Sequence, residues 1–265
     1  MTPSAPTERD LRTFAGLRRV VAILRGPEGC SWDRVQTHET LRPYLVEETA
    51  ETIAALDERD PAMLCEELGD LLFQVLIHVQ LAEERGEFRM PDVIGSIAGK
   101  LVRRHPHVFS DAVAETPGAV IEQWDDLKKR ERGPLPALAG IPEALPALAY
   151  AQAVQRRVAR AGFSWDSDAQ VWEALEEKLD ELRRASTPDE QRLELGDAVF
   201  ALANLARRLD IDAEDALRSA CRGFTRRFNA MEAMTGERGI DLKTADIDTK
   251  LALWEEAKAG TGGRS

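Results

Sequence analysis

The stretch EELGDLLFQVLIHVQLAEE, residues 66–84, begins with acids and continues as a long run of large apolar residues. Wound as an α-helix at about 100° per residue, it places Glu67, Asp70, Gln74 and His78 in one narrow stripe. Large apolar residues cover nearly all of the remaining circumference. A helix that is apolar on almost every side is buried, so the polar stripe is predicted to face an internal cleft rather than open water.

The rest of the chain shows the same helical periodicity. Apolar residues recur three and four positions apart, and no long run alternates in the manner of a β-strand. Breakers such as ERDP at 58–61 and TPG at 116–118 separate the helices. The fold class is therefore predicted to be all-α.

Composition narrows the classes of function. The 265 residues include 47 acids and 35 bases, which gives a net charge of −12 and makes a nucleic-acid-binding protein an unfavourable interpretation. The three cysteines form no CxxC pair, as expected in a reducing compartment. There is no apolar signal region and no run of about 18 apolar residues. We expect a cytoplasmic protein that does not bind membranes.

The order of motifs in the first half of the chain recurs in the second half. CSWD (30–33), EETAE (47–51), ELGDLLF (67–73), KLVRRH (100–105) and QWDDLKK (123–129) are followed by FSWD (163–166), EKLDE (177–181), ELGDAVF (194–200), GFTRRF (223–228) and LWEEAKA (253–259). This pattern indicates a tandem duplication. We predict helical domains at residues 1–131 and 149–265, joined by a Pro-, Gly- and Ala-rich linker at 132–148.

Two carboxylate pairs stand out in the first half. Glu48 with Glu51, and Glu67 with Asp70, are each three residues apart, so each pair shares one helix face with Cβ atoms about 5–6 Å apart. A solvated acidic surface is the alternative interpretation, but the apolar surroundings of Glu67 and Asp70 speak against it. Four converging carboxylates require protonation or a divalent cation, and a ligand set made only of oxygens favours Mg²⁺ or Mn²⁺.

Basic and aromatic residues accompany the acids. Lys100, Arg103 and Arg104 share one helix face, and Trp124 lies one turn from Lys128. Each cluster alone is compatible with a solvated basic surface. Together with bound Mg²⁺ they suit a polyphosphate, and a tryptophan can stack on a nucleobase. No GxxxxGK[ST] motif is present, so a P-loop is excluded.

With these flanking motifs, EETAE followed by ELGD closely resembles the MazG family of the all-α NTP pyrophosphatase superfamily. The resemblance runs from about residue 11 to residue 258, and the family's usual CPWD is CSWD here. It implies a homodimer of tandem four-helix units that hydrolyses NTPs and dNTPs to NMP and pyrophosphate with Mg²⁺, as a house-cleaning enzyme of the nucleotide pool. The implied metal ligands are Glu48, Glu51, Glu67 and Asp70, with Glu47 as a further catalytic acid. The implied substrate-binding residues are Trp32, Lys100, Arg103, Arg104, Trp124 and Lys128.

The second half departs from this pattern. Alignment of EKLDE with EETAE puts Lys178 where Glu48 stands, which leaves Glu181, Glu194 and Asp197 as an incomplete, degenerate site. A lysine replaces a metal ligand with a positive charge, so catalysis is expected in the first half. A helical regulatory protein that senses nucleotides is the alternative function. A narrower dUTP or phosphoribosyl-ATP pyrophosphohydrolase shares the metal signature but not the tandem layout.

Overall fold

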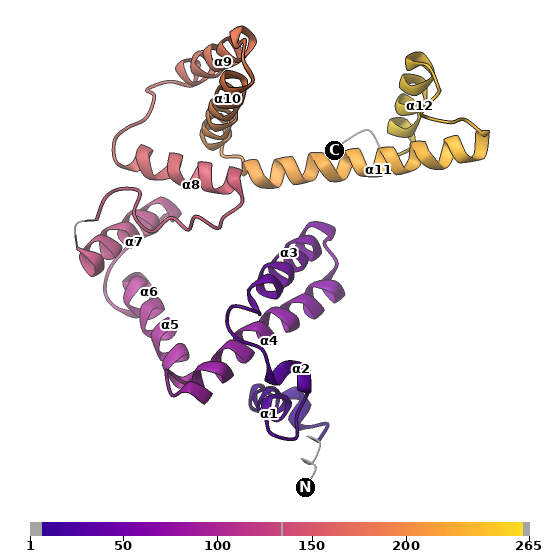
Figure 1. Ribbon diagram of the computed structural model, residues 1–265. Helices are drawn as coiled ribbons and strands as arrows, with labels where there is room; N and C mark the ends of the chain where they lie inside the picture. Colours follow the sequence, from indigo (N-terminus) through magenta and orange to yellow (C-terminus); the bar gives the residue numbers. More distant parts are fainter. Residues whose placement is uncertain (1–6, 134, 262–265) are drawn as a thin grey trace. The chain divides into compact units, whose positions relative to one another are not determined.

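The computed structural model describes residues 7–133 and 135–261, except for the side chains of part of α7. Within this range the chain forms helices and no β-strand, which confirms the predicted all-α class (Figure 1). No helix in these segments is long and apolar enough to span a membrane. The helices are η1 (Asp10–Arg12), α1 (Phe14–Arg25), α2 (Ser31–Arg34), α3 (Arg42–Glu58), α4 (Pro61–Arg85), α5 (Met90–Arg104), α6 (Pro106–Phe109), α7 (Pro117–Arg132), α8 (Ala147–Arg160), α9 (Asp168–Arg184), α10 (Pro188–Arg208), α11 (Ala213–Arg238) and α12 (Ile247–Gly260).

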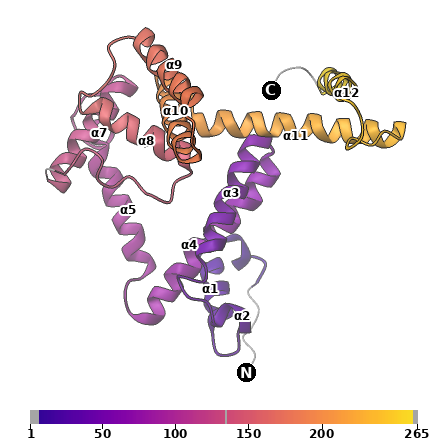
Figure 2. The same cartoon turned by 45° about the horizontal axis from the view of Figure 1, so that its top comes forward.

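The chain divides into two compact units, residues 1–131 and 132–265. In the first unit, α3 and α4 form an antiparallel pair (Figures 1 and 2). Arg59 ends α3 in the left-handed region, with φ of 56°. Asp60 then caps α4, because its carboxylate accepts from the backbone N–H groups of Ala62 and Met63. Pro61 follows in the first turn, where no helical N–H is needed. The tight connection holds the two helices side by side.

The core of the first unit lies toward the C-terminal half of α4. Val21 of α1, Leu41, and Leu76 and Ile77 of α4 are each no more than 2% exposed and belong to one apolar cluster. The outer side of α4 differs from the expectation that nearly its whole circumference is buried. The described chain leaves Leu68 51% and Val75 43% exposed, and Leu72 is also exposed. Neighbouring helices of the same unit therefore cover only part of this apolar helix.

The second unit also contains an antiparallel helix pair, α9 with α10. Thr187 begins α10 with a capping box, in which its hydroxyl accepts from the Glu190 N–H and the Glu190 carboxylate accepts from the Thr187 N–H. Gln152 of α8 is 2% exposed and joins α8 to the α10–α11 connection. Its amide donates to the Ile211 carbonyl at 2.7 Å and accepts from the Ala213 N–H at 3.1 Å. These contacts fix α8 beside the helix pair.

The last two helices pack on each other through a separate apolar cluster. Met231 of α11 contacts Leu253 and Ala257 of α12, and all three side chains are buried. Asp246 begins α12 as an N-cap, because its carboxylate accepts from the Thr249 N–H at 2.7 Å. Gly239 ends α11 in the left-handed region, with φ of 64°, a conformation that favours glycine.

Candidate active site

An acidic cluster lies between α3 and α4 of the first unit. One carboxylate oxygen each from Glu48, Glu67 and Asp70 lies within 4.8 Å of the other two. Glu48 comes from α3, whereas Glu67 and Asp70 are three residues apart on α4 and share one face of that helix. The Thr52 hydroxyl links the helices here, because it donates to the Glu48 carbonyl at 2.8 Å and reaches the Glu67 carbonyl at 3.5 Å. The three carboxylates thus converge from two helices.

Electrostatic repulsion and burial disfavour the ionised carboxylates of this cluster. Burial raises the pKa of Glu48, and the charges of Asp70 and Glu51 raise it further. The pKa of Glu67 is also raised, first by loss of solvent and then by the charges of Glu51 and Asp70. No ion pair among the described residues neutralises the cluster. A divalent cation fits this all-oxygen donor set and would favour the ionised carboxylates.

Two further predicted acids lie at the edge of the cluster. Glu51 is exposed, and no oxygen of it belongs to the convergent group. Its charge still acts on the site, since after burial it contributes to the raised pKa of Glu67. Glu47 is exposed as well, and its effect on the pKa of Glu48 is the smallest after burial and the other charges. The geometry therefore separates three convergent carboxylates from two flanking ones.

Two of the predicted basic residues pair with a carboxylate that does not belong to the acidic cluster. On α5, Arg104 pairs with Glu131 of α7 at 2.6 Å, and Arg103 reaches the same carboxylate at 3.5 Å. The pKa of Glu131 is lowered, first by the hydrogen bond from Arg104. Lys100 is half-buried on α5 and has no ion pair within the described chain. The side chain of Lys128 lies outside the described residues.

The two predicted tryptophans contact other aromatic rings. Trp32 is 46% exposed and meets Tyr44 edge-on, with ring centroids 5.5 Å apart. Trp124 meets His105 edge-on at 5.0 Å. Its indole N–H is buried and has no hydrogen-bond partner among the described residues. Trp32 thus offers an accessible ring face, whereas Trp124 has an unused donor.

The sequence placed Gln74 and His78 on the acidic stripe of α4 but did not predict which residues they contact. Gln74 is 3% exposed, and its amide nitrogen lies 3.5 Å from a carboxylate oxygen of Glu48. One turn further, His78 meets His38, with their Nδ1 atoms 2.7 Å apart and their rings stacked. Burial lowers the pKa of His78, and the neighbouring His38 lowers it further. The stripe from Glu67 to His78 was the available signal, but no spacing in the sequence connects it to His38.

Comparison with known proteins identifies the family of this chain. A model of the MazG nucleotide pyrophosphohydrolase domain matches residues 36–109. A nucleoside triphosphate pyrophosphohydrolase/pyrophosphatase MazG of Thermotoga maritima is 44% identical over 249 residues, which cover 93% of this chain and 96% of the relative. The chain belongs to the MazG family. A nucleoside triphosphate pyrophosphohydrolase of Escherichia coli K12 is 41% identical over 251 residues, 91% of this chain and 95% of that protein.

The part that matches the MazG domain model contains the acidic cluster. Residues 36–109 include α3, α4 and α5, and with them all five acids predicted for the first unit. They also include Lys100, Arg103 and Arg104, but neither Trp32, Trp124 nor Lys128. The match ends before the second unit. The acids of the second unit are thus outside the matched domain.

Relative to the MazG pattern of the first unit, the second acidic cluster contains a positive charge of its own. Lys178 of α9 lies 2.7 Å from a carboxylate oxygen of Glu181 and 4.0 Å from one of Asp197. The pKa of Lys178 is raised, first by the hydrogen bond to Glu181. The pKa of Glu181 is lowered, first by the same hydrogen bond. One oxygen of Glu194 is buried without a hydrogen-bond partner among the described residues. An ammonium group therefore lies among the second set of acids.

Proposed function

We propose that this chain hydrolyses nucleoside triphosphates, including deoxynucleoside triphosphates, to the monophosphate and pyrophosphate, with Mg²⁺ bound at the first unit. Family membership makes it a nucleoside triphosphate pyrophosphohydrolase. The convergence of Glu48, Glu67 and Asp70 carries the assignment to this site. Mn²⁺ has the same preference for oxygen ligands and is expected to substitute. A cytoplasmic house-cleaning role agrees with this reaction.

The described residues support distinct tasks in this reaction. Glu48, Glu67 and Asp70 would hold the cation, and Gln74 orients Glu48 through its amide. When bound, Mg²⁺ supplies a Lewis acid for phosphate oxygens and lowers the pKa of a bound water. Glu51 adds negative charge beside the three ligands and so strengthens their affinity for a cation. Trp32 presents an accessible ring on which a base can stack.

We further propose that the chain works as a homodimer. Leu68 and Val75 on α4 expose about half of their surface, and Leu45 and Val46 on α3 are also exposed. Apolar residues that gather on one helix pair favour association with another protein surface. The acidic cluster lies on the same two helices, so a second copy would also exclude water from its neighbourhood. Size-exclusion chromatography with light scattering measures the mass; a monomer at all concentrations would contradict the dimer.

Product analysis tests the reaction. Purified full-length protein is incubated with each NTP and dNTP in Mg²⁺, and anion-exchange chromatography separates the products. Monophosphate and pyrophosphate are expected, whereas diphosphate and orthophosphate would exclude the proposed chemistry. Activity that persists fully in EDTA would exclude the cation. The panel also separates a broad enzyme from one confined to dUTP.

Paired substitutions test the choice of unit. Glu67→Gln removes one of the convergent carboxylates and is expected to abolish turnover. Glu194→Gln is the matched change in the second unit and is expected to leave most of the turnover, because Lys178 already fills that cluster. The opposite result would place catalysis in the second unit.

A nucleotide-sensing role is the second candidate function, and the ion pair of Lys178 favours it for the second unit alone. A cluster that contains its own ammonium group does not need a divalent cation. Such a unit can retain a ligand pocket without supporting hydrolysis. The two functions are compatible in one chain because the acids of the two units belong to separate helix pairs.

A further inference from the structure

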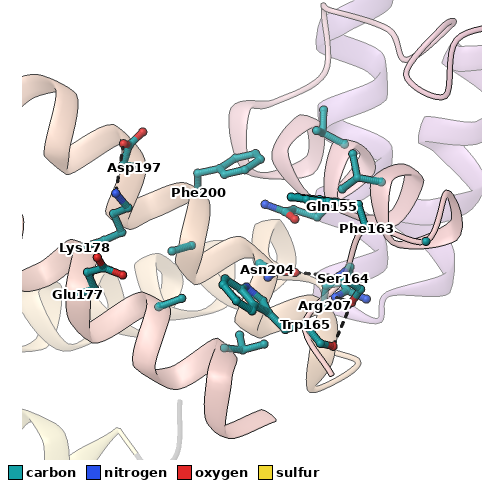
Figure 3. A pocket seen from close by; sticks show the side chains of 16 residues that line it. Gln155, Phe163, Ser164, Trp165, Glu177, Lys178, Asp197, Phe200, Asn204 and Arg207 are labelled. Atoms are coloured by element: carbon teal, nitrogen blue, oxygen red, sulfur yellow. Dashed lines mark hydrogen bonds and ion pairs between the residues drawn. The ribbon is translucent and has the colours of Figure 1, made fainter. Parts of the chain in front are cut away.

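The second unit contains a cavity of about 640 Å³ between α8, α9 and α10. The segment that connects α8 to α9 closes one side, where it contributes Phe163, Ser164 and Trp165 (Figure 3). Pockets of roughly 300–1,000 Å³ hold a single small organic ligand. All of the lining residues belong to the second unit, so the cavity is complete within it.

Aromatic side chains line the cavity and are exposed there, so they are not part of the buried core of the second unit. Trp165 is 48% exposed, Phe200 is 41% exposed and Phe163 is 82% exposed. In Figure 3, Trp165 and Phe200 project from different segments into the cavity. Flat heteroaromatic rings stack on aromatic side chains, and the strength of this stacking depends little on which heteroaromatic ring is bound. The middle of the cavity therefore suits a planar heteroaromatic group.

A cation without an acidic partner lies at one end. Arg207 donates through Nε to the Asn204 side-chain oxygen at 3.0 Å and through Nη2 to the Ser164 hydroxyl at 3.5 Å. No described carboxylate forms an ion pair with it. Burial lowers the pKa of Arg207, and the adjacent Arg208 lowers it further, so its charge is poorly compensated. An anion bound here would relieve that deficit.

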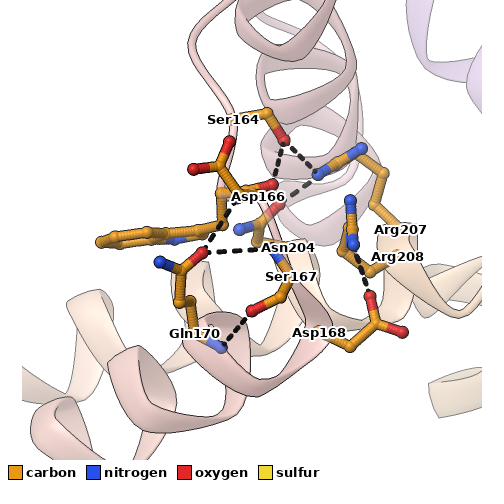
Figure 4. A network of polar contacts seen from close by, with 9 residues as sticks. Ser164, Asp166, Ser167, Asp168, Gln170, Asn204, Arg207 and Arg208 are labelled. Carbon is orange, nitrogen blue, oxygen red and sulfur yellow. Dashed lines mark hydrogen bonds and ion pairs between the residues drawn. The ribbon is translucent and has the colours of Figure 1, made fainter.

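Arg208, the next residue on α10, differs from Arg207 in its partner and its position. Arg208 lies 2.5 Å from the Asp168 carboxylate, outside the cavity, whereas Arg207 lines it (Figure 4). The two residues are adjacent on α10 and carry the same charge. Only Arg207 has guanidinium donors that face the cavity without a carboxylate. Arg208 therefore serves as an internal control.

The other end of the cavity is acidic. Lys178, Asp197 and Glu177 line it, and Lys178 is already bound to Glu181. One ammonium among several carboxylates leaves this end negative, so a phosphate chain is disfavoured there. Asp197 and Arg207 are ten residues apart on α10, or about 15 Å along the helix axis. A ligand with its ring in the middle is expected to direct a negative group toward Arg207.

We infer that this cavity binds a nucleoside monophosphate without a divalent cation, with the base on Trp165 and Phe200 and the phosphate on Arg207. The ligand class rests on the proposed function, because the monophosphate is the product of that reaction. A triphosphate bound with a cation is disfavoured, since in the predicted repeat Lys178 takes the place of Glu48, one of the three convergent carboxylates of the first unit. The second unit would thereby report product concentration rather than form product.

Calorimetric titration of the full-length protein tests the inference. AMP, GMP, CMP and UMP are titrated separately in EDTA, and saturable binding of at least one of them is expected. Arg207→Gln should weaken this binding roughly tenfold or more, because it removes a charge-assisted contact. Arg208→Gln is the matched control and should bind like the unaltered chain. Trp165→Leu, which removes a half-exposed ring, should weaken binding about tenfold as well.

Several outcomes would overturn the inference. Absence of binding in EDTA, or equal binding by the unaltered chain and Arg207→Gln, would do so. Equal loss in Arg207→Gln and Arg208→Gln would point to net charge instead of a contact. Nucleosides that bind as tightly as their monophosphates would exclude a phosphate at Arg207. Hydrolysis is measured separately on the unaltered chain, so a wrong reaction product would contradict the proposed function while metal-free monophosphate binding could still be observed.

Discussion

Glu48→Lys would build into the first unit the arrangement found in the second. In the predicted repeat, Glu48 corresponds to Lys178, whose ammonium lies 2.7 Å from Glu181 and 4.0 Å from Asp197. A lysine at position 48 would meet Glu51 and Asp70, the counterparts of Glu181 and Asp197 in that repeat, in the same way. We therefore expect this variant to fold, to lose cation binding at the first unit and to lose hydrolysis.

The distances set a lower limit to the effect. An ion held by three oxygens that lie within 4.8 Å of one another is closer than that to each of them. At 4.8 Å in water, a divalent cation gains about 1.7 kcal/mol from each negative charge. Glu48→Lys changes the charge by two units, so cation binding should weaken by about 3.5 kcal/mol or more, roughly 300-fold. Glu48→Gln changes the charge by one unit and should weaken it roughly 20-fold.

Electron paramagnetic resonance of free Mn²⁺ measures this directly. Full-length protein and both variants are titrated with Mn²⁺ at low ionic strength, and circular dichroism checks that each is folded. The order of affinity should be unaltered chain, then Glu48→Gln, then Glu48→Lys. If Glu48→Lys bound Mn²⁺ as tightly as Glu48→Gln, the electrostatic reasoning would be wrong. If neither differed from the unaltered chain, Glu48 would not be a ligand.

Three further expectations follow from the same contacts. Lys178→Glu should create an additional Mn²⁺ site in the second unit, visible as a higher stoichiometry; an unchanged stoichiometry would mean that the second cluster cannot form a site. The raised pKa values of Glu48 and Glu67 mean that in EDTA their contribution to stability is present below pH 4.5 and is lost as pH rises through the raised values. The melting temperature of the unaltered chain should therefore fall relative to Glu67→Gln over that interval, and parallel curves would contradict the shift. Gln152→Leu should lower the free energy of unfolding of the second unit by about 1–3 kcal/mol, because it removes two hydrogen bonds between a buried side chain and the backbone, and urea denaturation measures the change.

Helical periodicity was sufficient for the fold class because the relevant physics is local. The apolar spacing of α4, the Asp60 cap and Pro61 all lie within a few residues of the features they determine. The exposure of Leu68 and Val75 could not be predicted in this way. Whether an apolar helix face is covered depends on helices distant in sequence or on another molecule, and no spacing within α4 encodes that.

The site could be predicted only where its residues share a helix or a short hairpin. The Glu67 and Asp70 pair follows from a separation of three on α4, and Glu48 joins it across one tight turn. Arg103 and Arg104 differ, because their nearest carboxylate, Glu131, comes from another helix. The sequence showed that the same unit contains basic side chains and the acidic pairs, but it could not predict which carboxylate each basic side chain contacts. The sequences of the two halves did single out Lys178.

The predicted duplication gives two acidic helix pairs with the same electrostatic need and two ways of meeting it. Under the proposed function, an exchangeable cation would neutralise the first cluster, and such an ion can also coordinate phosphate oxygens and water. In the second unit the charge is attached to the chain as Lys178, whose ammonium group donates to Glu181 and forms an ion pair with Asp197. An ammonium group has no open coordination position for a water nucleophile, so it can balance charge but cannot activate water. The rate of hydrolysis at the first unit should therefore depend on the concentration of the divalent cation. Binding of a nucleotide beside Lys178 in the second unit should not depend on it.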